Sequence, residues 1–112
     1  MISASPDLDR MFEALADSTR RQIIDRLSRG PASVSELAAP FSMSLPAVSQ
    51  HLQVLERSGL VRTAKLGRVR TCSMDADSLS LVEKWLTDRR IGWEKRLDRL
   101  GAFLDDESEP PE

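Results

Sequence analysis

The segment "SLPAVSQHLQVLERSGLV", residues 44–61, indicates a helix with two chemically different sides. Its apolar side chains recur at helical spacing, and the pattern breaks at Ser58-Gly59. Ser44 has the side chain of a good N-cap, and Pro46 is tolerated in a first turn whose N–H groups have no acceptor within the helix. The stretch therefore predicts a helix that ends at about Ser58, with Gly59 as its C-terminal stop.

The two sides of this predicted helix differ in chemistry. At 100° per residue, Val48, Leu52 and Leu55 fall within about 60° of one another, so this side packs inward. The other side carries small or uncharged residues in its first two turns, where a surface helix usually carries Glu and Lys. Such a face lets the backbone approach a groove closely. We expect DNA contacts from Ser44, Pro46, Ala47, Ser49, Gln50, Gln53 and Arg57.

The segment before this helix completes a helix-turn-helix. Ser33 and Glu36 have the spacing of a capping box and open a short helix through Leu37, which Pro40 stops. In a helix-turn-helix the second helix lies in the major groove, where Gln50 can form a bidentate hydrogen-bond pair with adenine. The serines and the N-terminus of the helix can meet phosphates. The alternative is a packed helix whose polar residues are merely solvated.

Residues 60–74, "LVRTAKLGRVRTCSM", predict a small β-hairpin, because β-branched residues occur on both sides of Gly67. Its turn is basic. A hairpin next to a recognition helix supplies a second contact arm to the sugar-phosphate backbone, so we expect DNA contacts from Lys65, Arg68 and Arg70. The alternative is a solvated turn without a partner.

The charge of the chain is unevenly distributed. The net charge is −2, but five of the eighteen acids lie in residues 105–112. Between residues 43 and 74 the only acid is Glu56, against five basic residues. This local excess of positive charge is the kind of patch that attracts phosphates.

Three further helices follow from apolar periodicity. The first begins near Pro6, and the second is capped by Asp17 or Ser18 and ends at Gly30-Pro31. The third is one long or slightly broken helix from Asp75 onward. The apolar positions of the first are Leu8, Met11, Phe12 and Leu15, and those of the last are Leu79, Val82, Leu86, Trp93, Leu97, Leu100 and Leu104.

Length and composition bound the remaining possibilities. The 112 residues fit one domain, residues 1–104, followed by a flexible acidic tail, residues 105–112, that could compete with DNA. The chain has no apolar stretch near the roughly 20 residues that a membrane span needs and no signal-peptide pattern, so we expect a cytoplasmic protein without a membrane partner. One cysteine, Cys72, and one histidine, His51, are too few for a disulfide or a zinc site.

The runs "ALADSTRRQIIDRLSRGPASVSELA", residues 14–38, and "SLPAVSQHLQVLERSGLVRTAKLGRVRTCSM", residues 44–74, with the final helix, resemble the ArsR-type winged helix-turn-helix transcriptional regulators of prokaryotes. The likeness covers about residues 7–104. It implies a mainly α fold with a small β-hairpin, in which four helices, two strands and a last helix follow in order. It further implies a homodimeric repressor that binds double-stranded DNA at an inverted-repeat operator.

The resemblance also implies a dimer interface formed by the first and last helices. The expected contacts are Leu8, Met11 and Phe12 from the first helix and Leu79, Val82, Leu86, Trp93, Leu97, Leu100 and Leu104 from the last. Metal-sensing members of the family carry paired cysteines after a Glu-Leu, where this chain has Ala38 and Pro40. Others use histidine on the last helix, which has none here. We therefore expect neither metal nor cofactor, and the resemblance leaves any small-molecule effector open.

Several residues have a structural and a functional interpretation. His51 lies near the inward side of its helix, so we expect it to orient the helix rather than to read bases. We expect Arg20 and Arg21 to pair with nearby acids, and Cys72 to be a small strand residue. An enzyme with a Cys72-His51 nucleophile pair has no supporting motif, so we predict no catalytic residues. The main alternative function is a winged helix that binds a protein or a small-molecule ligand.

Overall fold

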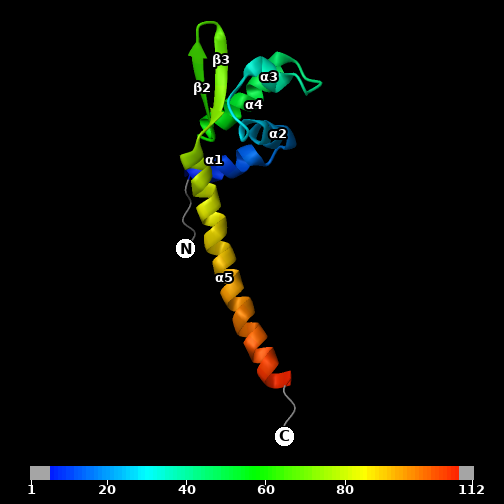
Figure 1. The fold of residues 1–112 in the computed structure, drawn as a ribbon, viewed down its shortest axis with the longest axis vertical. Coiled ribbons are helices and arrows are strands. Elements are labelled where there is room, and N and C mark those ends of the chain that lie inside the picture. Colours follow the sequence, from blue (N-terminus) through cyan, green and yellow to red (C-terminus); the bar gives the residue numbers. More distant parts are fainter. Residues whose placement is uncertain (1–5, 109–112) are drawn as a thin grey trace. The chain divides into compact units, whose positions relative to one another are not determined.

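The fold was obtained as a computed structural model, which describes residues 6–108. The predicted order of helices and strands is confirmed, and one short strand, β1, was not predicted. The described part of the chain divides after Val82 into two units. The elements are α1 (Pro6–Leu15), α2 (Ser18–Leu27), β1 (Ala32–Ser33), α3 (Val34–Ala38), α4 (Leu45–Arg57), β2 (Val61–Leu66), β3 (Val69–Met74) and α5 (Ala76–Ser108) (Figure 1).

The helix starts agree with the predicted caps. The Asp17 carboxylate accepts from the backbone N–H of Arg20 at the start of α2, and Ser44 caps α4 in the same way. At the start of α3 both bonds of the capping box between Ser33 and Glu36 are present. Each cap satisfies a backbone donor that has no acceptor inside its helix, so these starts are set locally.

The sheet has three antiparallel strands in the order β1-β3-β2. The hairpin of β2 and β3, hereafter the wing, turns at Gly67-Arg68, and Gly67 has φ 63°, which glycine adopts without strain. Strand β1 places Ala32 opposite Cys72 of β3. Strand β1 therefore connects the start of α3 to strand β3 of the wing. Two residues are too few for an alternating pattern, which explains why β1 was not predicted.

The hydrophobic core of the first unit joins α1–α4, the sheet and the start of α5. As predicted, the inward side of α4 is buried. The largest fully buried side chains are Ile23, Leu37, Val48, Leu55, Leu60, Val61 and Cys72. Met11 and Val82, predicted at the dimer interface, are only 3% and 6% exposed and also belong to this core. Met11 packs within the chain because α1 lies against α2 and α4, and Val82 belongs to the same buried core cluster.

Helix α5 continues beyond the predicted domain end at Leu104. It is one continuous helix to Ser108, so residues 105–108 of the predicted acidic tail are helical. The helix breakers of this region, Pro110 and Pro111, come later in the sequence, and Asp and Glu side chains do not stop a helix. The rest of the predicted tail, residues 109–112, lies outside the described residues.

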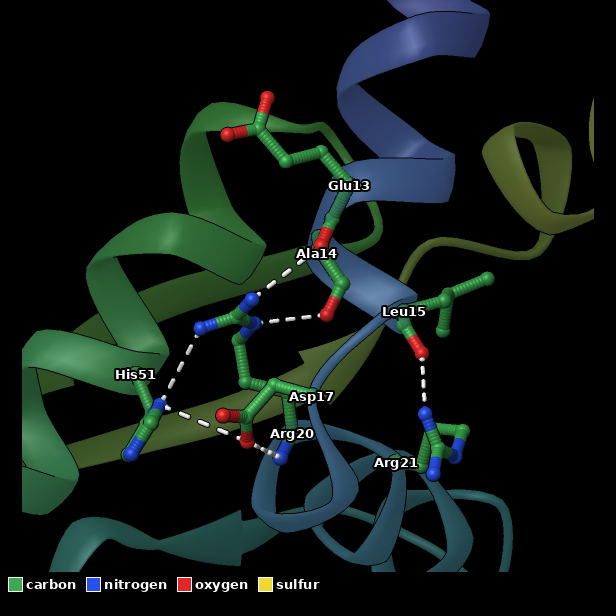
Figure 2. Close-up of polar contacts among 7 residues, drawn as sticks. All are labelled: Glu13, Ala14, Leu15, Asp17, Arg20, Arg21 and His51. Atoms are coloured by element: carbon green, nitrogen blue, oxygen red, sulfur yellow. Dashed lines mark hydrogen bonds and ion pairs between the residues drawn. The ribbon is translucent and has the colours of Figure 1, made fainter.

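A polar junction holds the end of α1 against α2 and α4 (Figure 2). The Arg20 guanidinium donates to the carbonyl oxygens of Ala14 at 2.6 Å and Glu13 at 3.1 Å. It also lies 3.4 Å from Nδ1 of His51 on α4. Because α1 has no basic residue in its last turn, Arg20 supplies the donors and positive charge that its carbonyl end attracts.

Arg21 donates to one carbonyl in the same turn, that of Leu15, at 2.7 Å. Both arginines thus make contacts within the chain, but the expectation that they pair with nearby acids is wrong. Both guanidinium groups donate to backbone carbonyls, and the His51 ring lies beside that of Arg20. The nearby Oδ1 atom of Asp17 accepts from the backbone N–H of Arg20 and caps α2. Arg20 thus connects three helices, whereas Arg21 connects two.

We predict that Arg20→Ala lowers the free energy of unfolding by about 2 kcal/mol, because it leaves two carbonyl oxygens of α1 without a charged donor. Arg21→Ala is the matched control, and its single exposed hydrogen bond should cost under about 1 kcal/mol. Urea unfolding followed by circular dichroism at one protein concentration measures both. Equal losses for the two variants would contradict the special role of Arg20.

Candidate nucleic-acid interface

The α3–α4 pair forms the helix-turn-helix, and α4 presents the predicted outward face. Among the predicted DNA contacts on and before α4, Ser44, Pro46, Gln50 and Gln53 are exposed, and Ala47 and Ser49 are half-buried. The buried row of Val48, Leu52 and Leu55 fixes the rotation of α4 about its axis. The first two turns therefore offer hydrogen-bonding and small side chains on one side, with no acidic residue among them.

Arg57 lies apart from the rest of this face. It is the last residue of α4, and it lines a surface hollow of about 430 Å³ together with Arg10, Glu13, Val54 and Ser58. Two of these residues belong to α1. The structure therefore brings Arg57 beside the end of α1, about two turns from Gln50 along α4.

His51 is held by groups from α2. Its Nδ1 atom lies 3.4 Å from Nη1 of Arg20 and 3.9 Å from Oδ1 of Asp17, and its side chain is 20% exposed. In Figure 2 the ring points from α4 toward these two groups. The prediction that His51 is partly covered is confirmed, and that it orients α4 stays a prediction.

The wing carries the second group of predicted contacts. Lys65, Arg68 and Arg70 are all exposed. Within the described residues, Lys65 and Arg68 have no acidic partner, whereas Arg70 lies 3.8 Å from Glu56 of α4. Arg62 of β2 is also paired, at 2.7 Å from Asp75. The basic residues of the wing therefore fall into two groups, unpaired and paired. The sequence did not distinguish them, because the acidic partners lie on neighbouring elements.

Two carboxylates near this surface have lowered pKa values. The backbone N–H of Ser78 lowers the pKa of Asp75, and the Arg62 guanidinium lowers it further. The backbone N–H of Arg20 lowers the pKa of Asp17. Each hydrogen bond favours the charged carboxylate, so both acids stay ionised at neutral pH and act as helix caps.

Cys72 lies in the middle of β3 and is fully buried. Burial raises the pKa of its thiol, because the charged thiolate loses its hydration. The interpretation of Cys72 as a small strand residue is confirmed. A buried, protonated thiol is a poor nucleophile, and His51 has other partners, so the structure does not form the Cys72-His51 pair.

The second unit is the remainder of α5 and exposes a continuous apolar row. Leu86, Trp93, Leu97, Leu100 and Leu104 follow one another at steps of seven, four, three and four residues and fall on one side of the helix. Each is more than half exposed in the single chain. We call this set the α5 row. Leu8, Phe12 and Leu79, also predicted at the interface, are half-buried against the core of the first unit.

Comparison with known proteins identifies the family. A family model for a helix-turn-helix domain matches residues 15–64. The HTH-type transcriptional regulator Rv2034 of Mycobacterium tuberculosis is 40% identical over 101 residues, which are 90% of this chain and 92% of the relative. The crystal structure of an ArsR family transcriptional regulator, RHA00566, matches with a TM-score of 0.76 and 50% identity, over 84% of this chain and 97% of that one. This chain belongs to the ArsR family of transcriptional regulators.

A structure solved in solution by NMR also has the winged fold of this ArsR family regulator. The homodimeric winged helix-turn-helix DNA-binding domain Mb0332 of Mycobacterium bovis matches with a TM-score of 0.62, over 88% of this chain and 95% of that domain. Its sequence identity is 24%, so this likeness concerns the fold. All three proteins are named as regulators or DNA-binding domains, and the prediction that this chain is not an enzyme is confirmed.

The described residues show neither an arranged metal site nor a helix that could cross a membrane. Within residues 6–108, no group of three or more His, Cys, Asp or Glu side chains is arranged to hold a metal ion. In the same part of this ArsR family regulator, no helix has the length and apolar character to span a bilayer.

Proposed function

We propose that this ArsR family regulator is a homodimer that binds an inverted-repeat operator and represses transcription without a metal ion. The observation that carries the proposal is the combination of two surfaces in one unit. An uncharged, hydrogen-bonding face on the first turns of α4 lies next to a wing with unpaired cations. The first suits base edges in the major groove, and the second suits phosphates.

The assignment of contacts follows from exposure and charge. Gln50 is exposed on the middle of α4 and has both a donor and an acceptor, as a bidentate pair with adenine requires. Pro46, Ala47, Ser49 and Gln53 surround it, and Ser44 lies at the helix N-terminus, which favours phosphate. Lys65 and Arg68 are the phosphate contacts of the wing. Arg57 and Arg70 are secondary candidates, because one lies beside α1 and the other pairs with Glu56.

The dimer is proposed from the α5 row. Five large apolar side chains on one side of a helix make a patch that single proteins rarely leave in water. A second copy presents the same row, and a two-fold axis brings like residues together. Half-site centres should then be separated by about one helical turn, near 34 Å. Repression follows because a dimer seated across a promoter excludes other proteins from the same DNA.

The first experiment is selection of bound duplexes from a random DNA pool at roughly physiological salt, where non-specific phosphate binding is suppressed. Enrichment of an inverted repeat supports the proposal. Binding of a protein or small molecule with no affinity for duplex would instead favour the ligand-binding alternative. Transcription from a promoter that contains the selected repeat then distinguishes repression from activation.

We predict that Gln50→Ala weakens binding to the selected operator by about 1 to 3 kcal/mol and relaxes base preference at one position of each half-site. Gln22→Ala, an exposed glutamine on α2, is the matched control and should bind like the unchanged chain. Titration of operators with single base changes measures the preference. A uniform loss at every position would contradict a base contact by Gln50.

We predict that Arg68→Ala weakens binding to all duplexes alike and reduces the slope of log K against log salt by about 0.9 for each bound protomer. Arg29→Ala removes the same charge from the segment after α2 and should leave the slope unchanged. Binding titrations over a range of salt concentrations give both slopes. A loss confined to the operator would contradict the phosphate role.

We predict that Leu97→Glu converts the dimer to a monomer, because the substitution places a charge in the middle of the α5 row. Ile91→Glu adds the same charge about 120° around the helix and should leave the dimer intact. Sedimentation velocity measures both. The dimer proposal fails if the unchanged chain is itself a monomer, or if the two variants dissociate equally.

A further inference from the structure

Glu56 connects the recognition helix to the wing. It lies in the last turn of α4, where its Oε1 atom accepts a hydrogen bond from Oγ1 of Thr63 at 2.9 Å. Its Oε2 atom lies 3.8 Å from Nη2 of Arg70. Thr63 and Arg70 stand on the two different strands of the wing. One carboxylate therefore contacts both strands.

These residues line a narrow cleft between α4 and the wing. The cleft also includes Ser49 and Gln53, both predicted DNA contacts, and its volume is about 10 Å³. A space of that size holds about one water molecule, so the cleft is a junction rather than a ligand pocket. The Glu56 side chain is 40% exposed, and the Arg70 side chain is 55% exposed. The carboxylate is thus part of the surface that would face DNA.

The register of the wing explains why a carboxylate is needed here. Lys65 and Arg70 are directly opposite each other on β2 and β3. Like charges at opposed positions repel, and Glu56, the only acid between residues 43 and 74, offsets this repulsion. The same contact removes Arg70 from the set of cations that are free to meet phosphate.

We propose that Glu56 limits the attraction of the wing for phosphate by holding the Arg70 guanidinium on α4. The inference rests on the proposed DNA binding and adds a positioning residue to it. Hydrogen bonding to Thr63 keeps the carboxylate in place, so it stays positioned to hold Arg70. The wing then contributes two phosphate contacts, Lys65 and Arg68. Arg70 stays paired with Glu56 and does not contact phosphate.

The test is a double-mutant cycle in which each variant binds a random-sequence duplex. The measured quantity is the slope of log K against log salt, called the salt slope. Glu56→Gln removes the charge but keeps an acceptor for Thr63, and Arg70→Gln removes the cation. We expect Arg70→Gln alone to change the slope by less than half of the Arg68→Ala effect. Glu56→Gln should steepen the slope by about 0.9 for each bound protomer, and the double variant should return it to the starting value.

Glu36→Gln is the matched control. Glu36 also pairs with an arginine, Arg26, at 3.6 Å, and glutamine preserves its capping box. This substitution changes the charge by the same amount but should leave the slope unchanged. Circular dichroism and sedimentation of every variant show that the fold and the oligomeric state are retained.

The outcomes separate the two proposals. An unchanged slope in Glu56→Gln overturns the role of Glu56. Equal steepening with and without Arg70 also overturns it, because that result indicates general charge repulsion rather than a held arginine. If the unchanged chain binds no duplex at all, the proposed DNA-binding function fails, and the inference fails with it.

Discussion

The placement of the recognition helix depends on the guanidinium of Arg20. A helix end leaves carbonyl oxygens without N–H partners inside the helix, and α1 has no basic residue in its last turn to satisfy them. Arg20 satisfies two of these oxygens from α2, and the same planar group lies against His51 on α4. One side chain therefore fixes the end of one helix and the side of another that is 31 residues away in sequence. The proposed DNA face of α4 points outward because these contacts and the buried row of Val48, Leu52 and Leu55 hold its other sides.

The wing is positioned by a second set of polar contacts, in which two of its arginines pair with acids. These pairs limit the number of wing cations that are available to phosphate. Arg62 is paired with Asp75 at the start of α5, and Arg70 lies near Glu56. Both pairs join the wing to neighbouring helices. Surface ion pairs contribute little stability, about 0 to 1 kcal/mol each, so their main effect is on orientation and on the number of cations available to phosphate. A count of Lys and Arg therefore overstates the charge that the wing offers.

Features that depend on a few neighbouring residues were predictable from sequence. The caps at Ser33 and Ser44 and the glycine turn at Gly67 were predicted correctly, because each depends on backbone geometry within four residues. For α2 the sequence left Asp17 and Ser18 as alternative caps, and the structure shows Asp17. Contacts between distant segments were not predicted correctly. Met11 and Val82 were predicted at the dimer interface, but the structure places both in the chain's own core. Apolar spacing alone does not distinguish these two kinds of burial. The acceptors of Arg20 and Arg21 were missed because backbone carbonyls leave no signal in the sequence.

The α5 row shows how local periodicity and tertiary burial diverge along one helix. In the first turns of α5, before the α5 row begins, the apolar side chains are covered, since Val82 belongs to the core of the first unit. From Leu86 onward the same spacing continues, but its side chains are more than half exposed in the single chain. Helices in water gain most of their stability from packing of an apolar face. Continuation of the row without cover therefore supports a partner of equal length, and a second copy of α5 related by two-fold symmetry meets that requirement. Under this proposal, one helix completes the core of its own domain and then forms the dimer that places two recognition helices on one DNA site.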